Sequence, residues 1–129
     1  MTRKHILLVD DDDDIREVAG MSLETVGGRR VSRASTGTQG IAKARAERPD
    51  AILLDVMMPG IDGPTTFRRL RADPLTREIP VILLTAKVQA ADRHRFEKLG
   101  VAGMLTKPFD PMALSDQVDA TLATEARRE

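Results

Sequence analysis

Four short apolar runs recur along the chain without alternating with polar residues. Continuous apolar runs of strand length, bounded by turn residues, are typical of strands buried on both faces, as in a parallel sheet that helices cover. A less regular segment, residues 30–34, is predicted as a fifth strand. The four apolar runs are residues 6–9, 51–54, 81–84 and the weaker 101–105.

Helical patterns lie between these runs. The first predicted helix carries apolar residues on one face from Ile15 to Val26, with Asp13 or Asp14 as its cap and a glycine pair after its end. Strict alternation of strands and helices predicts an open parallel sheet with right-handed crossovers and helices on both faces. The other helices are predicted over residues 41–47, from Pro64 to Pro74, over residues 89–99 with a thin apolar stripe, and from Pro111 to Leu122.

Composition excludes several classes of function. The 129 residues include no cysteine, tryptophan or tyrosine, which rules out thiol chemistry and leaves no aromatic platform for single-stranded nucleic acid. Twenty basic residues balance twenty acidic ones, so no net field favours nucleic acid or an anionic membrane. The apolar runs are too short for a signal peptide or a membrane span. We expect one cytoplasmic domain over residues 1–129, with a core over about 5–123 and a charged tail over 124–129.

Polar residues follow four of the predicted strands. In a doubly wound parallel sheet the carboxyl ends of the strands meet at one edge, where ligands bind. Crowded carboxylates repel one another, so a cation is expected there, and oxygen ligands with open positions suit Mg²⁺ shared with a phosphate group. With Mg²⁺ and an ammonium group in place, a carboxylate can accept a phosphoryl group, and Asp55 is the candidate. The residues expected to converge are Asp10, Asp11, Asp55, Thr85 and Lys107.

Four segments, taken in order, resemble the receiver domain of two-component response regulators, and the resemblance runs from about Ile6 to Leu122. It implies a flavodoxin-like fold with strand order 2-1-3-4-5 and a site at the switch point between the first and third strands. The segments are ILLVDDD (6–12), LLDVMMPGIDG (53–63), PVILLTA (80–86) and TKPF (106–109).

The resemblance also implies roles for individual residues. Asp55 would accept phosphate from a phosphohistidine on a histidine kinase or a histidine phosphotransfer protein. Asp11 and Asp55 would bind Mg²⁺ directly, with Mn²⁺ as a substitute, Asp10 would bind it through water, and the main-chain carbonyl of Met57 would complete the protein ligands. Lys107 would neutralise the phosphoryl oxygens and precede a cis peptide bond.

Switching is implied at Thr85, whose hydroxyl would move toward the phosphoryl group. Receiver domains often carry Tyr or Phe three residues before the lysine, where this chain has Met104, so an aromatic form of the switch is absent. Met57 and Lys87 occupy the positions that tune phosphate loss, and neither is suited to orient an attacking water. We therefore expect a long-lived acyl phosphate.

The partner surface implied by the resemblance comprises the fourth helix, the last strand and the last helix. The initial Met favours a free-standing regulator that acts by protein contact or by phosphate shuttling, and a receiver domain cut from a longer protein stays open as the alternative. His5 and His94 suggest no metal pair and are predicted at the surface. The residues expected on the partner surface are Arg93, Arg95, Lys98 and Met104.

Two other classes stay open. One is a receiver-like binding module that works without phosphorylation, although every site position holds the expected residue type. The other is an aspartate-nucleophile phosphatase of the haloacid dehalogenase kind, which generally has a second Asp two residues after the nucleophile. Met57 occupies that position and argues against turnover, so we expect a signalling domain and not an enzyme.

Overall fold

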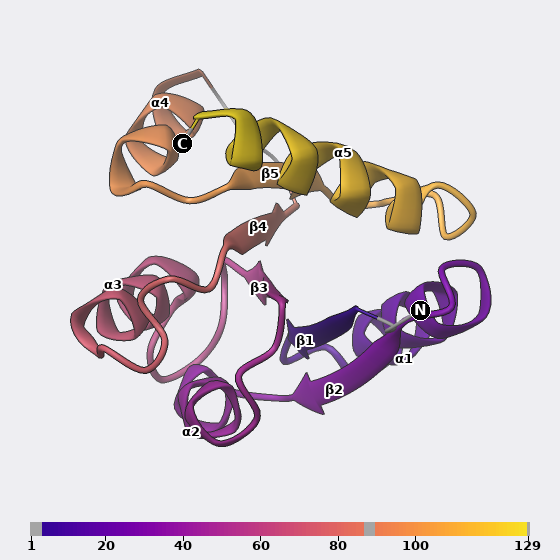
Figure 1. The fold of residues 1–129 in the computed structure, drawn as a ribbon, viewed down its shortest axis with the longest axis horizontal. Helices are drawn as coiled ribbons and strands as arrows, with labels where there is room; N and C mark the ends of the chain where they lie inside the picture. The colour runs from indigo at the N-terminus through magenta and orange to yellow at the C-terminus, as the bar shows by residue number, and fades with distance from the viewer. Residues whose placement is uncertain (1–3, 87–89, 129) are drawn as a thin grey trace.

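The computed structural model describes residues 4–86 and 90–128 and has five parallel strands in the order β2-β1-β3-β4-β5 (Figure 1). This order is the predicted one, and the flavodoxin-like fold class is confirmed. The strands are β1 (His5–Val9), β2 (Arg30–Ala34), β3 (Ala51–Asp55), β4 (Val81–Thr85) and β5 (Gly103–Thr106). The helices are α1 (Asp13–Thr25), α2 (Gly37–Glu47), α3 (Gly63–Ala72), α4 (Ala90–Leu99) and α5 (Leu114–Arg128).

Helices cover both faces of the sheet, which explains why the apolar runs do not alternate. Figure 1 shows α1 and α5 on one side of the strands and α2, α3 and α4 on the other. Within β1, Leu7 and Val9 belong to the core beneath α2, α3 and α4, whereas Ile6 and Leu8 belong to the core beneath α1 and α5. Because successive side chains of a strand point to opposite faces, both sets must be apolar.

The last strand begins later than its apolar run predicts. Val101 and Ala102 are buried but precede β5, which starts at Gly103. The amide of Ala102 donates to the carbonyl of Val81 at 2.8 Å, so this residue enters the core before regular pairing begins. Apolar character here reports burial and not strand conformation.

The cap of α1 corrects the prediction of Asp13 or Asp14. The side chain of Asp12 accepts hydrogen bonds from the amides of Asp14 and Ile15, at 2.9 and 3.1 Å. Asp13 and Asp14 lie in the first turn, where acidic residues favour the positive end of the helix dipole.

The prediction that His5 lies at the surface is wrong. The residue is 7% exposed, and its Nε2 lies 2.7 Å from Ser32 Oγ on the neighbouring strand. Its backbone amide donates to Asp50 Oδ2 at 2.7 Å. Among the described residues, no helix is both long enough and apolar enough to cross a membrane.

Candidate functional site

The carboxyl ends of four strands meet at one edge of the sheet. Asp10 directly follows β1, Asp55 and Thr85 are the last residues of β3 and β4, and Lys107 directly follows β5. Parallel pairing brings these ends to the same edge. Carboxylate oxygens of Asp10, Asp11 and Asp55 lie within 4.8 Å of one another, so the expected convergence is observed.

Lys107 bridges the two buried carboxylates. Its Nζ lies 2.9 Å from Asp10 Oδ2 and 3.1 Å from Asp55 Oδ1. Asp10 is fully buried and Asp55 is 4% exposed, so both ion pairs are largely shielded from water. The backbone amide of Lys107 donates to the carbonyl of Thr85 at 2.7 Å, and the Lys107–Pro108 peptide bond is cis. Backbone and side chain of Lys107 therefore both contribute to the site.

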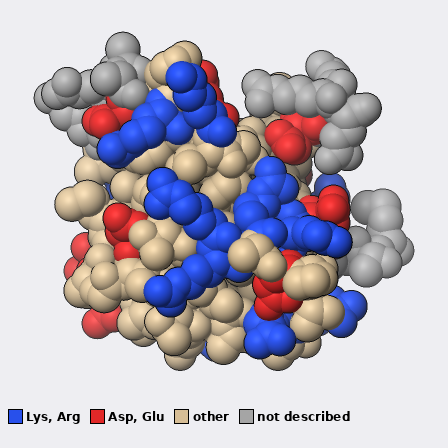
Figure 2. Space-filling model, turned by 90° about the vertical axis from the view of Figure 1, so that its left-hand side faces the viewer, with Lys and Arg blue, Asp and Glu red and all other residues tan. Residues whose placement is uncertain are grey.

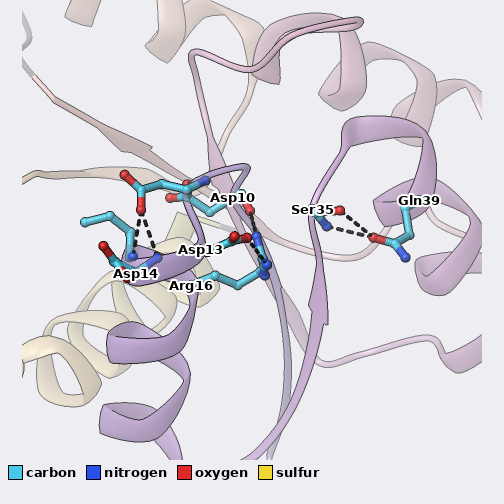
Figure 3. A network of polar contacts seen from close by, with 8 residues as sticks. Asp10, Asp13, Asp14, Arg16, Ser35 and Gln39 are labelled. Carbon is cyan, nitrogen blue, oxygen red and sulfur yellow. Dashed lines mark hydrogen bonds and ion pairs between the residues drawn. The ribbon is translucent and has the colours of Figure 1, made fainter.

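The acidic run after β1 divides into residues with different surroundings. Asp10 Oδ1 accepts a hydrogen bond from the amide of Asp12 at 2.9 Å, while Asp12 itself caps α1 and Asp11 stays exposed. Arg16 reaches back from α1, where its guanidinium donates to the carbonyl of Asp10 at 2.8 Å and pairs with Asp13 (Figure 3). The helix start therefore fixes the backbone that carries Asp10.

Arg16 is a neighbour of the site that no pattern in the sequence singled out. Its place in the first turn of a helix that begins with an acidic run is the signal that could have indicated it. The guanidinium binds the backbone carbonyl of Asp10, whereas the carboxylate of Asp10 contacts Lys107 and the amide of Asp12. Arg16 therefore supports the position of Asp10.

Burial raises the pKa of Asp55 to about 6, and the negative charge of Asp10 adds to the rise. The hydrogen bond and the charge of Lys107 oppose it without cancelling it. For Lys107, burial lowers the pKa, but hydrogen bonds and charges of Asp10 and Asp55 outweigh burial and raise it. The Lys107 ammonium therefore offsets only part of the effect that burial and the neighbouring Asp10 have on Asp55.

The donor set fits a divalent cation. Asp10 Oδ2 is buried and, among the described residues, accepts no well-oriented hydrogen bond; the Lys107 ammonium is its close charged neighbour. Together with the exposed carboxylate of Asp11, the site offers oxygen ligands and an open side. Such a combination suits Mg²⁺, which keeps several waters and binds through one or two carboxylates.

A cavity of about 250 Å³ opens beside the acceptor, between the end of β4 and α4. Thr85 lies in its wall and is buried, and Phe96 of α4 belongs to the same lining. Met57 stands at the rim with 77% of its surface exposed. Met104 is half-buried and packs against the core beneath α2, α3 and α4. The expected tuning residue Lys87 lies outside the described residues.

Comparisons with known proteins agree with this geometry. The sequence profile described as "Response regulator receiver domain" matches residues 6–119. Protein PilH of Pseudomonas aeruginosa is 39% identical over 118 residues, which are 92% of this chain and 97% of PilH. CseB of Streptomyces coelicolor, a transcriptional regulatory protein, is 40% identical over 118 residues, which are 92% of this chain and 49% of CseB.

Solved structures give the same result. The chemotaxis protein CheY4 of Vibrio cholerae superposes with a TM-score of 0.87 at 28% identity, covering 93% of this chain and 99% of that one. A response regulator from Chloroflexus aurantiacus gives 0.85 at 35% identity, with 95% and 99% covered. The chain spans about half the length of CseB and of several other regulators that it matches. It belongs to the receiver-domain family of two-component response regulators.

Proposed function

We propose that this chain is a phospho-acceptor of a two-component phosphorelay and that Asp55 takes the phosphoryl group. The observation that carries the proposal is the Asp55 carboxylate at the end of β3, beside two further aspartates and 3.1 Å from the Lys107 ammonium. The donor is a phosphohistidine on a histidine kinase or a histidine phosphotransfer protein. The receiver acts in the cytoplasm as one domain over residues 1–129.

In the transfer, a carboxylate oxygen of Asp55 forms a bond to phosphorus while the bond from phosphorus to the donor imidazole breaks. The donor imidazole leaves with the electron pair of the broken bond and, because its other ring nitrogen carries a proton, it leaves as neutral imidazole; the other product is the acyl phosphate on Asp55. Lys107 neutralises charge on the phosphoryl oxygens, which is most of what phosphoryl transfer needs from a protein. Mg²⁺, held by Asp11, Asp55 and the Met57 carbonyl and by Asp10 through water, would supply further charge neutralisation.

Thr85 couples the new charge to α4. Its side chain is buried in the wall of the cavity that also contacts Phe96, so a displacement of the hydroxyl toward Asp55 changes the packing beneath α4. The response then appears on the surface of α4, β5 and α5, where Arg93, Arg95 and Lys98 are exposed and Met104 is half-buried. A downstream output protein reads this surface.

The donor protein docks beside the site, on exposed apolar side chains of α1 and of the loop before α5. Val18, Met21 and Met112 are 45%, 55% and 69% exposed. Ser22 Oγ donates to the carbonyl of Pro111, which ties this loop to α1. Because α1 begins three residues after Asp10, a donor on this surface is close to the acceptor.

Intact-mass spectrometry after incubation with acetyl phosphate tests the proposal. We expect one phosphoryl group on the wild type in Mg²⁺, and none in EDTA or on Asp55→Asn. Asp14→Asn is the matched control, because it removes one exposed carboxylate from the acidic run outside the cluster. A protein that stays unmodified with both acetyl phosphate and a phosphohistidine donor contradicts the proposal and favours the phosphorylation-independent module.

The acyl phosphate is long-lived. Met57 stands at the exposed rim of the site with an apolar side chain that cannot orient water for attack on phosphorus. Met57→Asn supplies an amide at this rim and should shorten the half-life of the phosphorylated protein. A half-life of seconds for the wild type in Mg²⁺ buffer is incompatible with this part of the proposal.

A further inference from the structure

Charged residues are shared unevenly between the two helical layers. Helix α1 carries four acidic residues and one arginine, whereas α3 carries three arginines and no acidic residue. The two helices lie on opposite sides of the sheet (Figure 1). The formal net charge of zero therefore conceals a molecule with an acidic side and a basic side.

On the basic side, Figure 2 shows a broad band of Lys and Arg side chains. Four exposed arginines there form no ion pair with any other described residue. They come from the end of α2, from α3 and from the loop that follows α3. We call them the arginine face, and they are Arg48, Arg68, Arg69 and Arg77.

Arginines near α1 and α5 behave differently. Arg16 pairs with Asp13, Arg29 with Asp119 and Arg33 with Glu24. On that side of the sheet, each of these three arginines has a carboxylate partner. The four residues of the arginine face form no ion pair with a described carboxylate, and Arg68 acts on Asp62 through its charge alone, so their guanidinium groups retain their capacity for anions.

The scaffold beneath the arginine face is held in place. Arg45 Nε of α2 lies 2.7 Å from Asp73 Oδ2, which joins α2 to the loop after α3. Arg71 donates to the carbonyls of Arg77 and Gly100 at 3.0 and 3.2 Å, and its guanidinium lies 5.3 Å from the centre of the Phe67 ring. These contacts restrict the backbone that carries the unpaired arginines, which lowers the entropy lost when a partner binds.

We propose that the arginine face binds an acidic segment of a partner protein, rich in Asp and Glu. Guanidinium groups form paired, planar hydrogen bonds with carboxylates, so several of them together select a run of acidic side chains. Leu75, 40% exposed in the loop after α3, adds an apolar contact beside the charges. The inference concerns α2 and α3 and does not depend on phosphorylation of Asp55.

Nucleic acid fits this face less well. The aromatic residues of the chain are three phenylalanines, of which Phe67 and Phe96 are buried and Phe109 is half-buried. No described aromatic ring is therefore exposed for stacking on bases.

Fluorescence anisotropy with a short labelled oligoglutamate peptide tests the proposal on the full chain. We expect Arg68→Glu combined with Arg69→Glu to weaken binding about tenfold, because two attractive charges become repulsive. Lys4→Glu combined with Arg30→Glu makes the same change in net charge at exposed positions beside β1 and β2, and this control should bind like the wild type. Asp55→Asn should also bind like the wild type.

Amide chemical shifts of the wild type, followed during the same titration, locate the peptide without any variant. We expect the changes on α3 and on the loop over residues 73–78. Shift changes on α1 or α5, equal weakening by both charge-reversed pairs, or tighter binding of an oligothymidylate of equal charge would each overturn the proposal. Loss of phosphorylation at Asp55 with unchanged peptide binding would contradict the proposed function alone.

Discussion

Helices α3 and α4 lie next to each other over the same face of the sheet, and each has ten residues, yet they are held very differently. Helix α3 buries Thr66, Phe67 and Leu70 and is capped by Asp62. In α4, among the side chains that the structure describes, Phe96 is the one that is buried. Local stability follows buried apolar contacts, so α3 is a fixed part of the fold and α4 is free to shift.

This difference matches the chemistry at the strand ends. The chain runs from Asp55 through a short loop to α3, and from Thr85 to α4. The acceptor is therefore attached to the firmly held helix, and the proposed switch residue to the weakly held one. A signal that begins as added charge can then change α4 without disturbing the backbone that positions Asp55.

Truncating the buried phenylalanine of each helix should show the largest difference. Phe67→Ala removes a ring from a site that cannot collapse, and we expect a loss of about 4 kcal/mol in the free energy of unfolding. Phe96→Ala should cost about half as much, because α4 can settle onto the sheet after the ring is removed. Urea unfolding monitored by far-UV circular dichroism measures both values. Equal losses would show that α4 is held as firmly as α3.

Charge removal at Asp55 tests whether the site strains the fold without a metal. The folded-state pKa of about 6 lies above the ordinary 3.8, so stability present below about pH 4 is lost as the pH rises through 6. A shift of this size corresponds to about 3 kcal/mol at most. In EDTA, Asp55→Asn should therefore unfold at higher urea concentration than the wild type at pH 7.5, and at the same concentration near pH 4.

Adding Mg²⁺ distinguishes the relief of charge repulsion in Asp55→Asn from an unrelated improvement in the packing of this variant. The ion should stabilise the wild type and bring it toward Asp55→Asn, because it neutralises the carboxylates that repel one another. A variant that is equally stabilised at both pH values would contradict the electrostatic explanation.

The buried strands could be predicted from the sequence because a single physical signal defines them. The runs that form β1, β3 and β4 are apolar throughout, and each strand differs from its prediction by one residue. The start of α2 was missed by four residues, because the small residues Gly37 and Gly40 are buried there without an apolar side chain. Thr36, whose side chain accepts from the amide of Gln39, is the cap.

The convergence of the site could also be predicted, because parallel topology brings all strand ends to one edge. Which aspartate of the acidic run is buried and which one caps α1 could not be predicted. Five consecutive aspartates each have a side chain able to cap a helix, and the backbone path after β1 decides that Asp10 is buried and Asp12 caps. The burial of His5 could not be predicted from the sequence either, because its side chain contacts Ser32 of another strand.

Removing the cap of α3 should have a moderate effect. Asp62 accepts from the amide of Thr65 at 2.8 Å, and this hydrogen bond lowers the pKa of its carboxyl. Asp62→Ala should lower the free energy of unfolding by about 1 kcal/mol at neutral pH. The cost should vanish as the pH falls below 3.8 through the lowered pKa, because the protonated carboxyl is a weaker acceptor.

Asp92 of α4 is the matched control for this cap. It lies in the first turn of α4 and pairs loosely with Arg95 at 3.6 Å. Asp92→Ala should therefore cost a few tenths of a kcal/mol, as expected for an exposed pair in one helix. Urea unfolding at pH 7 and pH 3 compares the two variants. A larger loss for Asp92→Ala would indicate that the start of α4 is anchored after all.

The smallest effect is expected where the two helices are tied together. Arg71 of α3 donates to the carbonyl of Gly100, directly after α4, and its guanidinium lies over the Phe67 ring. Arg71→Ala should lower the free energy of unfolding by about 0.5 kcal/mol, because the side chain is exposed and water replaces its hydrogen bonds. Arg69→Ala removes an equal charge from the same helix without this link.

For Arg71→Ala, amide hydrogen exchange, which reports local opening, is a more sensitive measurement than the free energy of unfolding. The amide of Gly100 donates to the carbonyl of Glu97 in the last turn of α4, and its hydrogen exchange reports whether that turn is intact. We expect faster exchange at this amide in Arg71→Ala than in Arg69→Ala, with exchange at Leu70 of α3 unchanged in both. Equal exchange at Gly100 would mean that contacts with the sheet, and not the link to α3, hold the end of α4. The firmly held helix would then place no restraint on the helix that we expect to switch.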